Sequence, residues 1–315
     1  MRPKLIRNTT LQWLIIGFIA AVVILSMFPP DFSVTRKGAN YAVHTMFACL
    51  FMGLFFLTIR QPRLMFTSFI ACSLLCLFLK NASNNTLTHP QKTIEEVFDI
   101  SQFNASAFDG NVNASIKSIL EDNSDVISIN EISPDWGREL KKELRKAYPY
   151  HTIVYRNEDF LGLGIFSKLP FNDIDTFYHA DIPNLAVEFS NGIDEVCLVN
   201  SFVYPEISSN DNKKVKAHFN TLKEYVKRID LPFITVGDYN QVQWSTHLQD
   251  LKKNCMLHDS RRYQFFDNPT DHIFFSQHFN CVDFQIISNR FTNHLGVKGS
   301  YQINRNFVNA DKNSK

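Results

Sequence analysis

The residues best suited to chemistry in this chain stand where short apolar runs end. The clearest case is the run 233–236, which is followed directly by Gly237 and Asp238 and, two positions later, by Asn240. Such a run predicts a buried strand that delivers a carboxylate and a carboxamide at its carboxyl end. Glycine lets the backbone come close to a ligand, and side chains two apart point the same way along an extended chain. An ordinary turn after a strand explains this stretch equally well by itself.

Four further polar residues occupy comparable positions. Asn104 and Glu131 each follow a predicted strand, Asp271 opens another, and His294 lies in a polar stretch near the end of the chain. Each has an ordinary explanation by itself, namely a turn, a helix entry, a cap and a surface loop. Their chemical meaning therefore depends on a fold that brings them to one place.

The chain after residue 96 alternates short apolar runs with patterns of helical period. The runs predict strands at 97–103, 125–130, 152–156, 162–167, 185–189, 196–203, 233–238, 270–276, 282–287 and 297–303. The helical patterns predict helices at 112–121, 134–147 and 211–228. This order of elements suits a sandwich of two sheets covered by helices.

The first 80 residues contain three long segments without Asp, Glu, Lys or Arg. They predict three transmembrane helices, at about residues 11–29, 41–59 and 64–79, because roughly 20 apolar residues span a bilayer core at 1.5 Å per residue. A signal peptide is the competing interpretation of the first segment, which follows three basic residues, but no small-residue cleavage site comes after it. Buried helices of a globular core are the other alternative.

These segments define the organisation of the chain. It is divided into a transmembrane region (1–80), a linker (81–95), a domain (96–305) and a polar tail (306–315). Basic residues precede the first segment and lie between the second and third, which places those ends in the cytoplasm. Arg36 and Lys37 in the first loop oppose this orientation, and Asp31 offsets one of them. An odd number of spans then puts the domain outside the cytoplasm.

Charge is distributed unevenly between the two parts. Residues 1–80 carry 8 Lys and Arg and 1 acidic residue, which leaves 24 basic and 30 acidic residues, a net charge of −6, for residues 81–315. A nucleic-acid partner is therefore not expected, because its phosphates are normally met by a basic surface.

Six motifs, in this order, resemble those of the endonuclease/exonuclease/phosphatase superfamily over roughly residues 97–304. They are Phe103-Asn104, the strand 125–130 with Glu131, the Gly-Ile-Phe-Ser-Lys-Leu-Pro stretch 164–170, the Gly-Asp-Tyr-Asn stretch 237–240, Thr270-Asp271-His272 and the Thr-Asn-His-Leu-Gly stretch 292–296. No single motif is specific, but six in register indicate the fold. The resemblance implies an α/β (α+β) domain, a four-layer αββα sandwich of two mixed β-sheets flanked by helices.

The resemblance also implies a role for each residue at the strand ends. Glu131, helped by Asn104, is the expected ligand of Mg²⁺, with Mn²⁺ as a substitute, because hard cations take carboxylate and amide oxygens. Asp238 is expected to orient or deprotonate the attacking water. Asn240 is expected to fix the position of Asp238 and to contact the phosphate.

Three further residues receive roles in the same way. His294 is expected to donate a hydrogen bond or a proton to a phosphoryl oxygen. Asp271 is expected to set the tautomer of that histidine and keep it charged, since a nearby carboxylate raises a histidine pKa. Ser167, in the stretch 164–170, is expected to contact substrate.

Two positions depart from the pattern of the superfamily. Phe202 stands where many relatives have a histidine, and Tyr204 is the candidate that takes its place. Asn293 stands where an aspartate is usual, which weakens the case for a second metal ion.

Together these features predict a membrane-anchored, Mg²⁺-dependent phosphoesterase that hydrolyses a lipid-linked phosphate or pyrophosphate of the polyprenyl type outside the cytoplasm. A bacterial inner membrane is favoured because Asn104-Ala105-Ser106 would place a glycosylation sequon on a catalytic residue. One alternative is a phospholipid or sphingomyelin phosphodiesterase, or a nuclease, of the same fold. Another is a degenerate domain that binds without turnover.

The cysteines carry a separate expectation. If the domain is extracytoplasmic, Cys255 and Cys281 are the candidates for a disulfide. Cys197, in an apolar strand, is expected to be a buried small hydrophobic residue.

Overall fold

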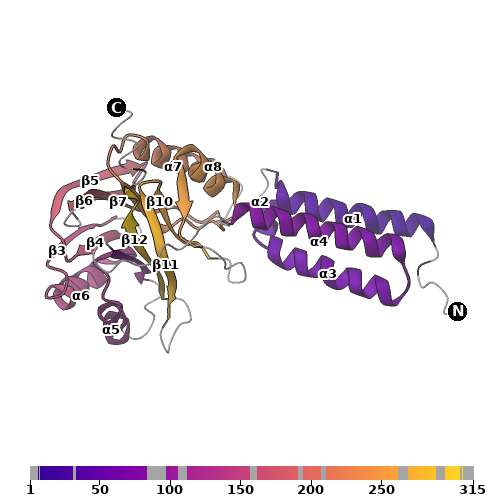
Figure 1. Ribbon diagram of the computed structural model, residues 1–315, viewed down its shortest axis with the longest axis horizontal. Coiled ribbons are helices and arrows are strands. Elements are labelled where there is room, and N and C mark those ends of the chain that lie inside the picture. The colour runs from indigo at the N-terminus through magenta and orange to yellow at the C-terminus, as the bar shows by residue number, and fades with distance from the viewer. Residues whose placement is uncertain are drawn as a thin grey trace.

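In the computed structural model, a bundle of helices at the N-terminal end adjoins a β-sandwich that contains the rest of the chain (Figure 1). The structure describes residues 6, 8–30, 33–83, 97–105, 112–156, 162–190, 194–206, 211–261, 269–288, 295–305 and 307. Most of the predicted linker (81–95) and of the polar tail (306–315) lies outside the described residues.

Three long helices, joined by a short one, form the bundle. They are α1 (Thr9–Met27), α3 (Ala42–Thr58) and α4 (Pro62–Ala82), with α2 (Ser33–Ala39) at the end nearest the sandwich. Only α1 and α4 among the described residues are long and apolar enough to cross a membrane, whereas α3 has 17 residues. The prediction of three spans is therefore supported for two. The third segment is also longer than predicted, because its helix continues past Lys80.

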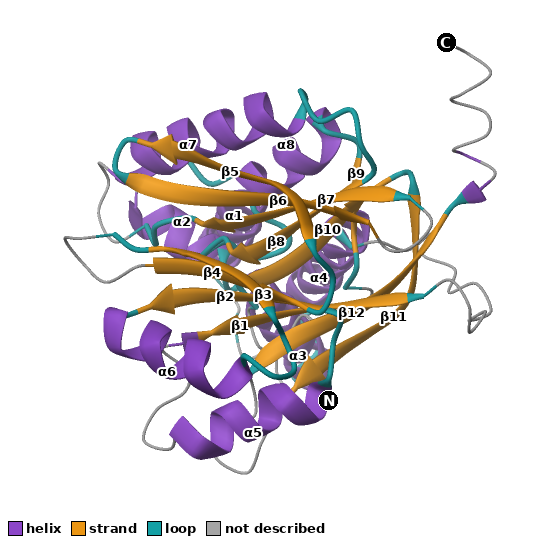
Figure 2. Ribbon diagram, turned by 90° about the vertical axis from the view of Figure 1, so that its left-hand side faces the viewer, coloured by secondary structure: helices purple, strands orange, loops and turns teal. Residues whose placement is uncertain are grey.

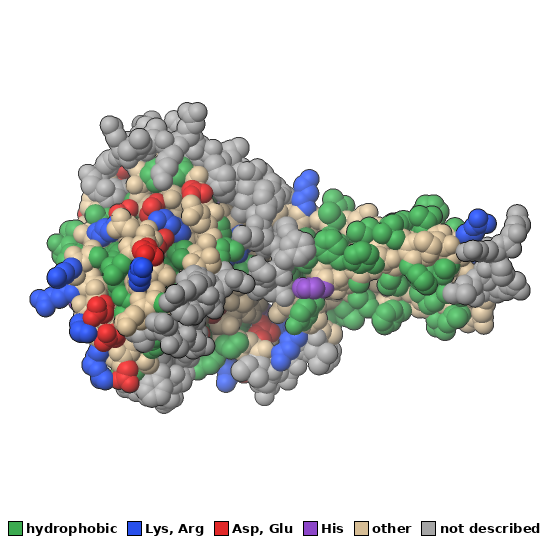
Figure 3. Space-filling view, turned by 90° about the horizontal axis from the view of Figure 1, so that it is seen from below, with side chains coloured by type: hydrophobic (Ala, Val, Ile, Leu, Met, Phe, Trp, Pro, Cys, Tyr) green, Lys and Arg blue, Asp and Glu red, His purple; other side chains and the backbone are tan. Residues whose placement is uncertain are grey.

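The bundle exposes large apolar side chains on its outer surface. Trp13, Phe18 and Phe51 are 61%, 69% and 64% exposed, and apolar side chains cover much of the bundle in Figure 3. Water disfavours an apolar surface of this extent, which is typical of a face that meets lipid or another protein.

Two mixed six-stranded sheets form the sandwich. In strand order, the first sheet contains β11 (Phe279–Ile287), β12 (Gly296–Ile303), β1 (Phe98–Asn104), β2 (Val126–Ile132), β4 (Gly162–Ser167) and β3 (Tyr150–Val154). The second contains β5 (Phe171–His179), β6 (Ile182–Ser190), β7 (Glu195–Phe202), β8 (Phe233–Asp238), β10 (Asp271–Ser276) and β9 (Leu257–Asp259). The pairs β1–β2 and β7–β8 are parallel, and the other pairs are antiparallel.

Helices cover the outer face of each sheet (Figure 2). The helices α5 (Val112–Asp122) and α6 (Pro134–Leu144) cover the first sheet, and α7 (Asp211–Val226) and α8 (Thr246–Asn254) cover the second. One apolar cluster fills the space between the sheets, and one lies under each pair of helices. The predicted αββα sandwich of two mixed sheets is confirmed.

Four elements were not predicted, namely α2, α8, β5 and β9. Most side chains of β5 are exposed or half-buried, so this edge strand lacks the apolar run by which a buried strand is recognised. The helix α8 buries only Leu248 and Leu251. Short or largely solvated elements leave little periodic signal in a sequence.

The cysteines do not form the predicted disulfide. Cys255 and Cys281 are both free and buried, and they belong to clusters on opposite faces of the second sheet. A strand layer therefore separates their side chains. Cys197 is buried among apolar residues, as predicted.

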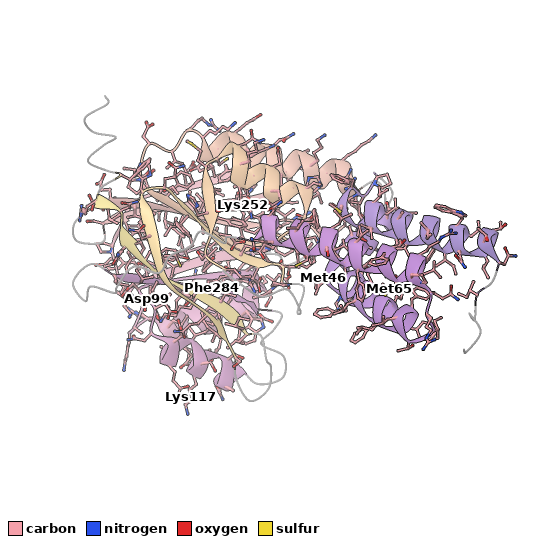
Figure 4. The ribbon with its side chains drawn as sticks, turned by 45° about the vertical axis from the view of Figure 1, so that its right-hand side comes forward. Met46, Met65, Asp99, Lys117, Lys252 and Phe284 are labelled. Carbon is pink, nitrogen blue, oxygen red and sulfur yellow. The ribbon has the colours of Figure 1, made fainter. Side chains whose placement is uncertain are left out.

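The bundle is joined to the sandwich mainly by the chain that follows β8. Val242 and Trp244 pack against a cluster from α3 and α4 that includes Val43 and Leu79. The indole nitrogen of Trp244 donates to Ala39 O at 2.9 Å. In Figure 4, Lys252 of α8 lies toward the bundle, whereas Asp99, near the start of β1, lies on the far side of the sandwich.

Candidate active site

Polar side chains from both sheets converge where β1, β2 and β8 end. The amide nitrogen of Asn104 donates to Glu131 Oε1 at 3.1 Å and to Asp238 Oδ2 at 3.3 Å. Asn104 and Glu131 belong to the first sheet and Asp238 to the second. The parallel strands β1 and β2 end together at one edge, and the end of β8 lies against them across the sandwich.

Asp238 faces Asp271 directly across the antiparallel pair β8–β10. Both side chains are 6% exposed. Burial raises the pKa of Asp238 to about 7, helped by the charge of Asp271 and, more weakly, by that of Glu131. The backbone N–H of Asn240, which donates to Asp238 Oδ1 at 2.9 Å, opposes this rise in pKa. A carboxylate with a pKa near neutrality is suited to accept a proton from water.

Two of the polar residues have left-handed backbone conformations. Glu131 has φ 58° and Asn240 has φ 50°, in a region that residues other than glycine rarely adopt. At Glu131 the β2–β4 pairing is irregular between Ile129 and Ile132. A bulge of this kind turns a side chain away from the regular alternation of a strand. Strained backbone of this type is concentrated at functional sites.

Gly237 allows β8 to approach β7 closely just before Asp238. Its φ is 153°, and a Cβ added there would lie 1.8 Å from Ser201 O. No other residue fits this position without moving one of the two strands. The glycine therefore helps to place Asp238 against the first sheet.

Two buried asparagines that were not predicted connect the sheets beside the site. Asn130 donates to Ser201 O at 3.1 Å, and Asn200 lies 3.5 Å from Ile129 O and 3.4 Å from Gly164 O. Both side chains are fully buried. The available signal in the sequence was an amide within each of two largely apolar strands.

The sequence profile of the endonuclease/exonuclease/phosphatase family matches residues 101–290, more than half of the chain. This range contains Asn104, Glu131, Asp238 and Asp271. The chain belongs to the endonuclease/exonuclease/phosphatase family.

Solved structures of several proteins resemble the endonuclease/exonuclease/phosphatase domain of this chain. A family protein from Beutenbergia cavernae has 15% identity and a TM-score of 0.56, with 66% of this chain and 72% of that chain covered. A family protein from Bacteroides vulgatus has 13% identity and a TM-score of 0.55, with 67% and 100% covered. The human Nocturnin catalytic domain, solved with a bound sulfate anion, has 13% identity and a TM-score of 0.52, with 66% of this chain and 94% of that chain covered. No curated protein matches the chain. At these identities the likeness shows the fold alone.

Tyr204 lies beside the endonuclease/exonuclease/phosphatase site. It follows Val203, whose carbonyl accepts a hydrogen bond from the Asn240 amide at 2.8 Å. The Tyr204 hydroxyl accepts a hydrogen bond from Arg156 at 2.9 Å, and the guanidinium lies 5.3 Å from the ring centroid. Arg156 also forms an ion pair with Asp181, and the sequence did not indicate that Arg156 reaches Tyr204. Phe202, where many relatives have histidine, is buried between the sheets.

The structure does not bring Ser167 to the site. Ser167 pairs with Val126 at the start of β2, whereas Glu131 lies five residues further along that strand, or about 16 Å at 3.3 Å per residue. Its buried hydroxyl accepts a hydrogen bond from Leu169 N at 2.9 Å, which is a structural role in the turn after β4. The positions of Asn293 and His294 lie outside the described residues.

The oxygen-rich site suits a hard divalent cation, although no three His, Cys, Asp or Glu side chains among the described residues are arranged to hold a metal ion. Glu131 and Asn104 offer one carboxylate and one amide, and Mg²⁺ needs few protein ligands because it keeps several waters and substrate oxygens. Asp238 and Asp271 add negative charge beside them. Burial is the main cause of the raised pKa of Asp238, and the repulsion from Asp271 and Glu131 that adds to it is of the kind that a cation relieves.

Proposed function

We propose that this protein is a membrane-anchored, Mg²⁺-dependent phosphoesterase that hydrolyses a phosphate or pyrophosphate ester carried by a lipid. The observation that carries the proposal is the convergence of Asn104, Glu131 and Asp238 from two sheets. Family membership favours hydrolysis of a phosphate ester. The apolar bundle, directly beside this domain, favours a substrate held in a membrane.

The catalytic roles follow from the geometry of these side chains. A water placed in line with the phosphorus would lose a proton to Asp238, whose pKa of about 7 allows it to exist as a base at neutral pH. The water oxygen forms the new P–O bond as the bond to the leaving oxygen breaks, and the leaving oxygen takes up a proton. Asn240 holds Asp238 through its backbone N–H and lines the approach to it.

Glu131 and Asn104 are the proposed ligands of Mg²⁺. The ion would supply positive charge for the oxygens of the transferred phosphoryl group, which is the main demand of phosphoryl transfer. Asp271, opposite Asp238, would tune its proton affinity. We keep His294 as the proposed donor to a phosphoryl oxygen on the basis of the sequence motif.

The anchoring rests on the composition and arrangement of the bundle. Two helices have the length and apolar character of membrane spans, and α3 runs beside them in Figure 1. We propose that all three cross a bacterial inner membrane, with the N-terminus in the cytoplasm and residues 81–315 outside. A reporter fused after Lys315 that is active only in the cytoplasm would contradict this topology.

The test of the activity is a comparison of substrates with the full-length protein in lipid vesicles. We expect Mg²⁺-dependent release of phosphate from a polyprenyl pyrophosphate that exceeds cleavage of sphingomyelin and of nicked duplex DNA. EDTA should abolish this release, and Mn²⁺ should restore part of it. Faster cleavage of DNA than of every lipid would contradict the lipid assignment, and absence of turnover on all substrates would leave a binding domain.

A further inference from the structure

A cavity of about 560 Å³ lies where the helical bundle meets the endonuclease/exonuclease/phosphatase domain. Residues at the ends of the bundle helices, including Met27 of α1 and Phe78 of α4, form part of its wall. The rest comes from α2, α7, α8 and the chain that follows β7 and β8. Its volume lies within the range of small-molecule sites. If α1 and α4 cross a bilayer, this cavity lies at the level of the lipid head groups.

The charged residues that line the cavity are mainly basic. Arg36, Lys37, Lys216 and Lys223 are basic, and Glu206 and Asp250 are acidic, an excess of two positive charges in contact with a domain whose net charge is −6. Arg36 pairs with Glu206 at 3.2 Å, and Lys223 pairs with Asp250. The other two basic residues of the lining are Lys37 of α2 and Lys216 of α7, which flank the cavity from the bundle and from the domain.

Apolar side chains line the same cavity. Val242 and Trp244 belong to the cluster that packs on α3 and α4, and Met27, Pro29 and Phe78 lie on the bundle side. A site for a soluble anion has no need of an apolar wall continuous with membrane helices. A wall with both characters fits a molecule that has an anionic head and an apolar chain.

The cavity borders the candidate active site at Asn240. Asn240 lines the cavity, and its backbone N–H donates to the carboxylate of Asp238 at 2.9 Å. A phosphate group held at this end of the cavity would therefore contact Asn240, the residue that holds the proposed base through its backbone N–H.

We propose that this cavity binds the phosphate-bearing head of a membrane lipid, with its chain against the bundle, and presents the phosphate to the catalytic residues. The proposal rests on the proposed function and adds to it the entry site and the residues that select for a lipid. Lys216 is the residue that attracts the head group, and Trp244 is the residue that contacts the chain.

A binding experiment separates this proposal from the question of turnover. The full-length protein is studied in detergent micelles, with the substitution Asp238→Asn to stop hydrolysis. The substitutions Trp13→Phe and Trp136→Phe leave Trp244 as the single tryptophan that fluoresces. Farnesyl pyrophosphate is compared with farnesol, which lacks the charge, and with inorganic pyrophosphate, which lacks the chain. We expect farnesyl pyrophosphate to change the Trp244 fluorescence with a Kd at least tenfold lower than either partial ligand.

Substitutions on α7 identify the charge that matters. Lys216→Glu should raise the Kd for farnesyl pyrophosphate at least tenfold, and Lys216→Arg should retain binding. Lys213→Glu is the matched control, because Lys213 is an exposed lysine on the same helix that does not line the cavity. Equal effects of Lys213→Glu and Lys216→Glu, or equal affinity for pyrophosphate with and without the chain, would overturn the proposal.

The same variants with Asp238 restored distinguish failure of the proposed function from failure of the cavity assignment. We expect Lys216→Glu to raise KM for a lipid pyrophosphate at least tenfold, and the control Lys213→Glu to change this KM less than twofold. Selective binding without hydrolysis of any lipid would contradict the proposed function and leave the cavity assignment in place. Hydrolysis of lipid that is insensitive to Lys216→Glu would overturn the cavity assignment alone.

Discussion

In the first half of the sandwich, β1, α5 and β2 form a parallel strand pair joined by a helix, and in the second half β7, α7 and β8 repeat this arrangement. The strand orders of the two sheets also correspond, from the outer hairpins β11–β12 and β5–β6 to the edge strands β3 and β9. The two halves differ in what stands where their parallel strands end. The first half ends in Asn104 and Glu131, and the second ends in Phe202 and Asp238.

The surroundings of these residues differ as well. Asn104 and Glu131 are half-buried, whereas Phe202 and Asp238 are 3% and 6% exposed. A carboxylate that keeps contact with solvent suits a hydrated cation, and a carboxylate deprived of solvent acquires a pKa near neutrality. One framework therefore provides two environments, one suited to hold a metal ion and the other to accept a proton.

The largest loss of turnover is expected from substitution of Asp238 in the second half. Asp238→Asn keeps the shape of the side chain but removes the base, and we expect turnover to fall about 10³-fold or more, within the range for general acid–base groups and charged stabilisers. Asp173→Asn is the control, since Asp173 is exposed on the edge strand β5. Initial rates on the lipid substrate test this expectation, and near-native activity of Asp238→Asn would remove Asp238 from the mechanism.

A somewhat smaller loss of turnover, which should respond to Mg²⁺, is expected from substitution of Glu131 in the first half. Glu131→Gln should reduce turnover about 10²- to 10³-fold, because it removes one charge from a site that stabilises charge. Unlike the loss in Asp238→Asn, this loss should be partly restored at higher Mg²⁺ concentration. Titration of activity with Mg²⁺ in both variants makes the comparison, and an identical response would show that the two halves do not have separate roles.

The pH dependence of stability follows from the raised pKa of Asp238. Between about pH 4, where an aspartate of the unfolded chain titrates, and about pH 7, the folded protein holds a proton that the unfolded chain has released. The free energy of unfolding should therefore decrease as the pH rises through this window in EDTA. Urea unfolding at each pH tests this expectation. In Asp238→Asn the free energy of unfolding should decrease less over this pH range. A decrease of equal size in that variant would show that a group other than Asp238 causes it.

The smallest effect is expected where the two halves are joined. Asn130→Ala removes the donor to Ser201 O and should lower the free energy of unfolding by about 1–3 kcal/mol, the usual range for a buried hydrogen bond whose partner remains. Asn172→Ala, at the exposed edge strand β5, is the control. Urea unfolding of the two variants compares them. A cost no larger than that of the control would mean that packing alone holds the sheets together at the site.

Much of the fold could be predicted because its strands are buried and bounded by polar residues. The strand at Gly162–Ser167 begins and ends where the apolar run does. Asn104, Glu131 and Asp238 could be predicted as site residues because each is a polar residue at the end of such a run. Exposed β5 carries no such contrast, so it was missed.

The contacts between distant residues were harder to predict. The resemblance of the stretch 164–170 to a motif of the superfamily placed Ser167 at the site, but strand direction puts it at the opposite end of β4. Arg156 reaches Tyr204 from a sheet edge far away in sequence, and nothing local indicates such a meeting. Cys255 and Cys281 were candidates for a disulfide on the expectation that the domain is extracytoplasmic, but both are free and a strand layer separates their side chains.

The three long helices of the bundle have 19, 17 and 21 residues, which correspond to about 28, 26 and 32 Å at 1.5 Å per residue. Such lengths respond differently to a given bilayer thickness, and helices tilt to relieve the mismatch. Trp244 donates to Ala39 at the end of the bundle and stands only four residues after Asn240, so we expect a change in the tilt of a membrane-spanning bundle to shift the chain that follows β8. If the bundle crosses a bilayer as proposed, turnover should accordingly vary with the acyl-chain length of the surrounding phosphatidylcholine.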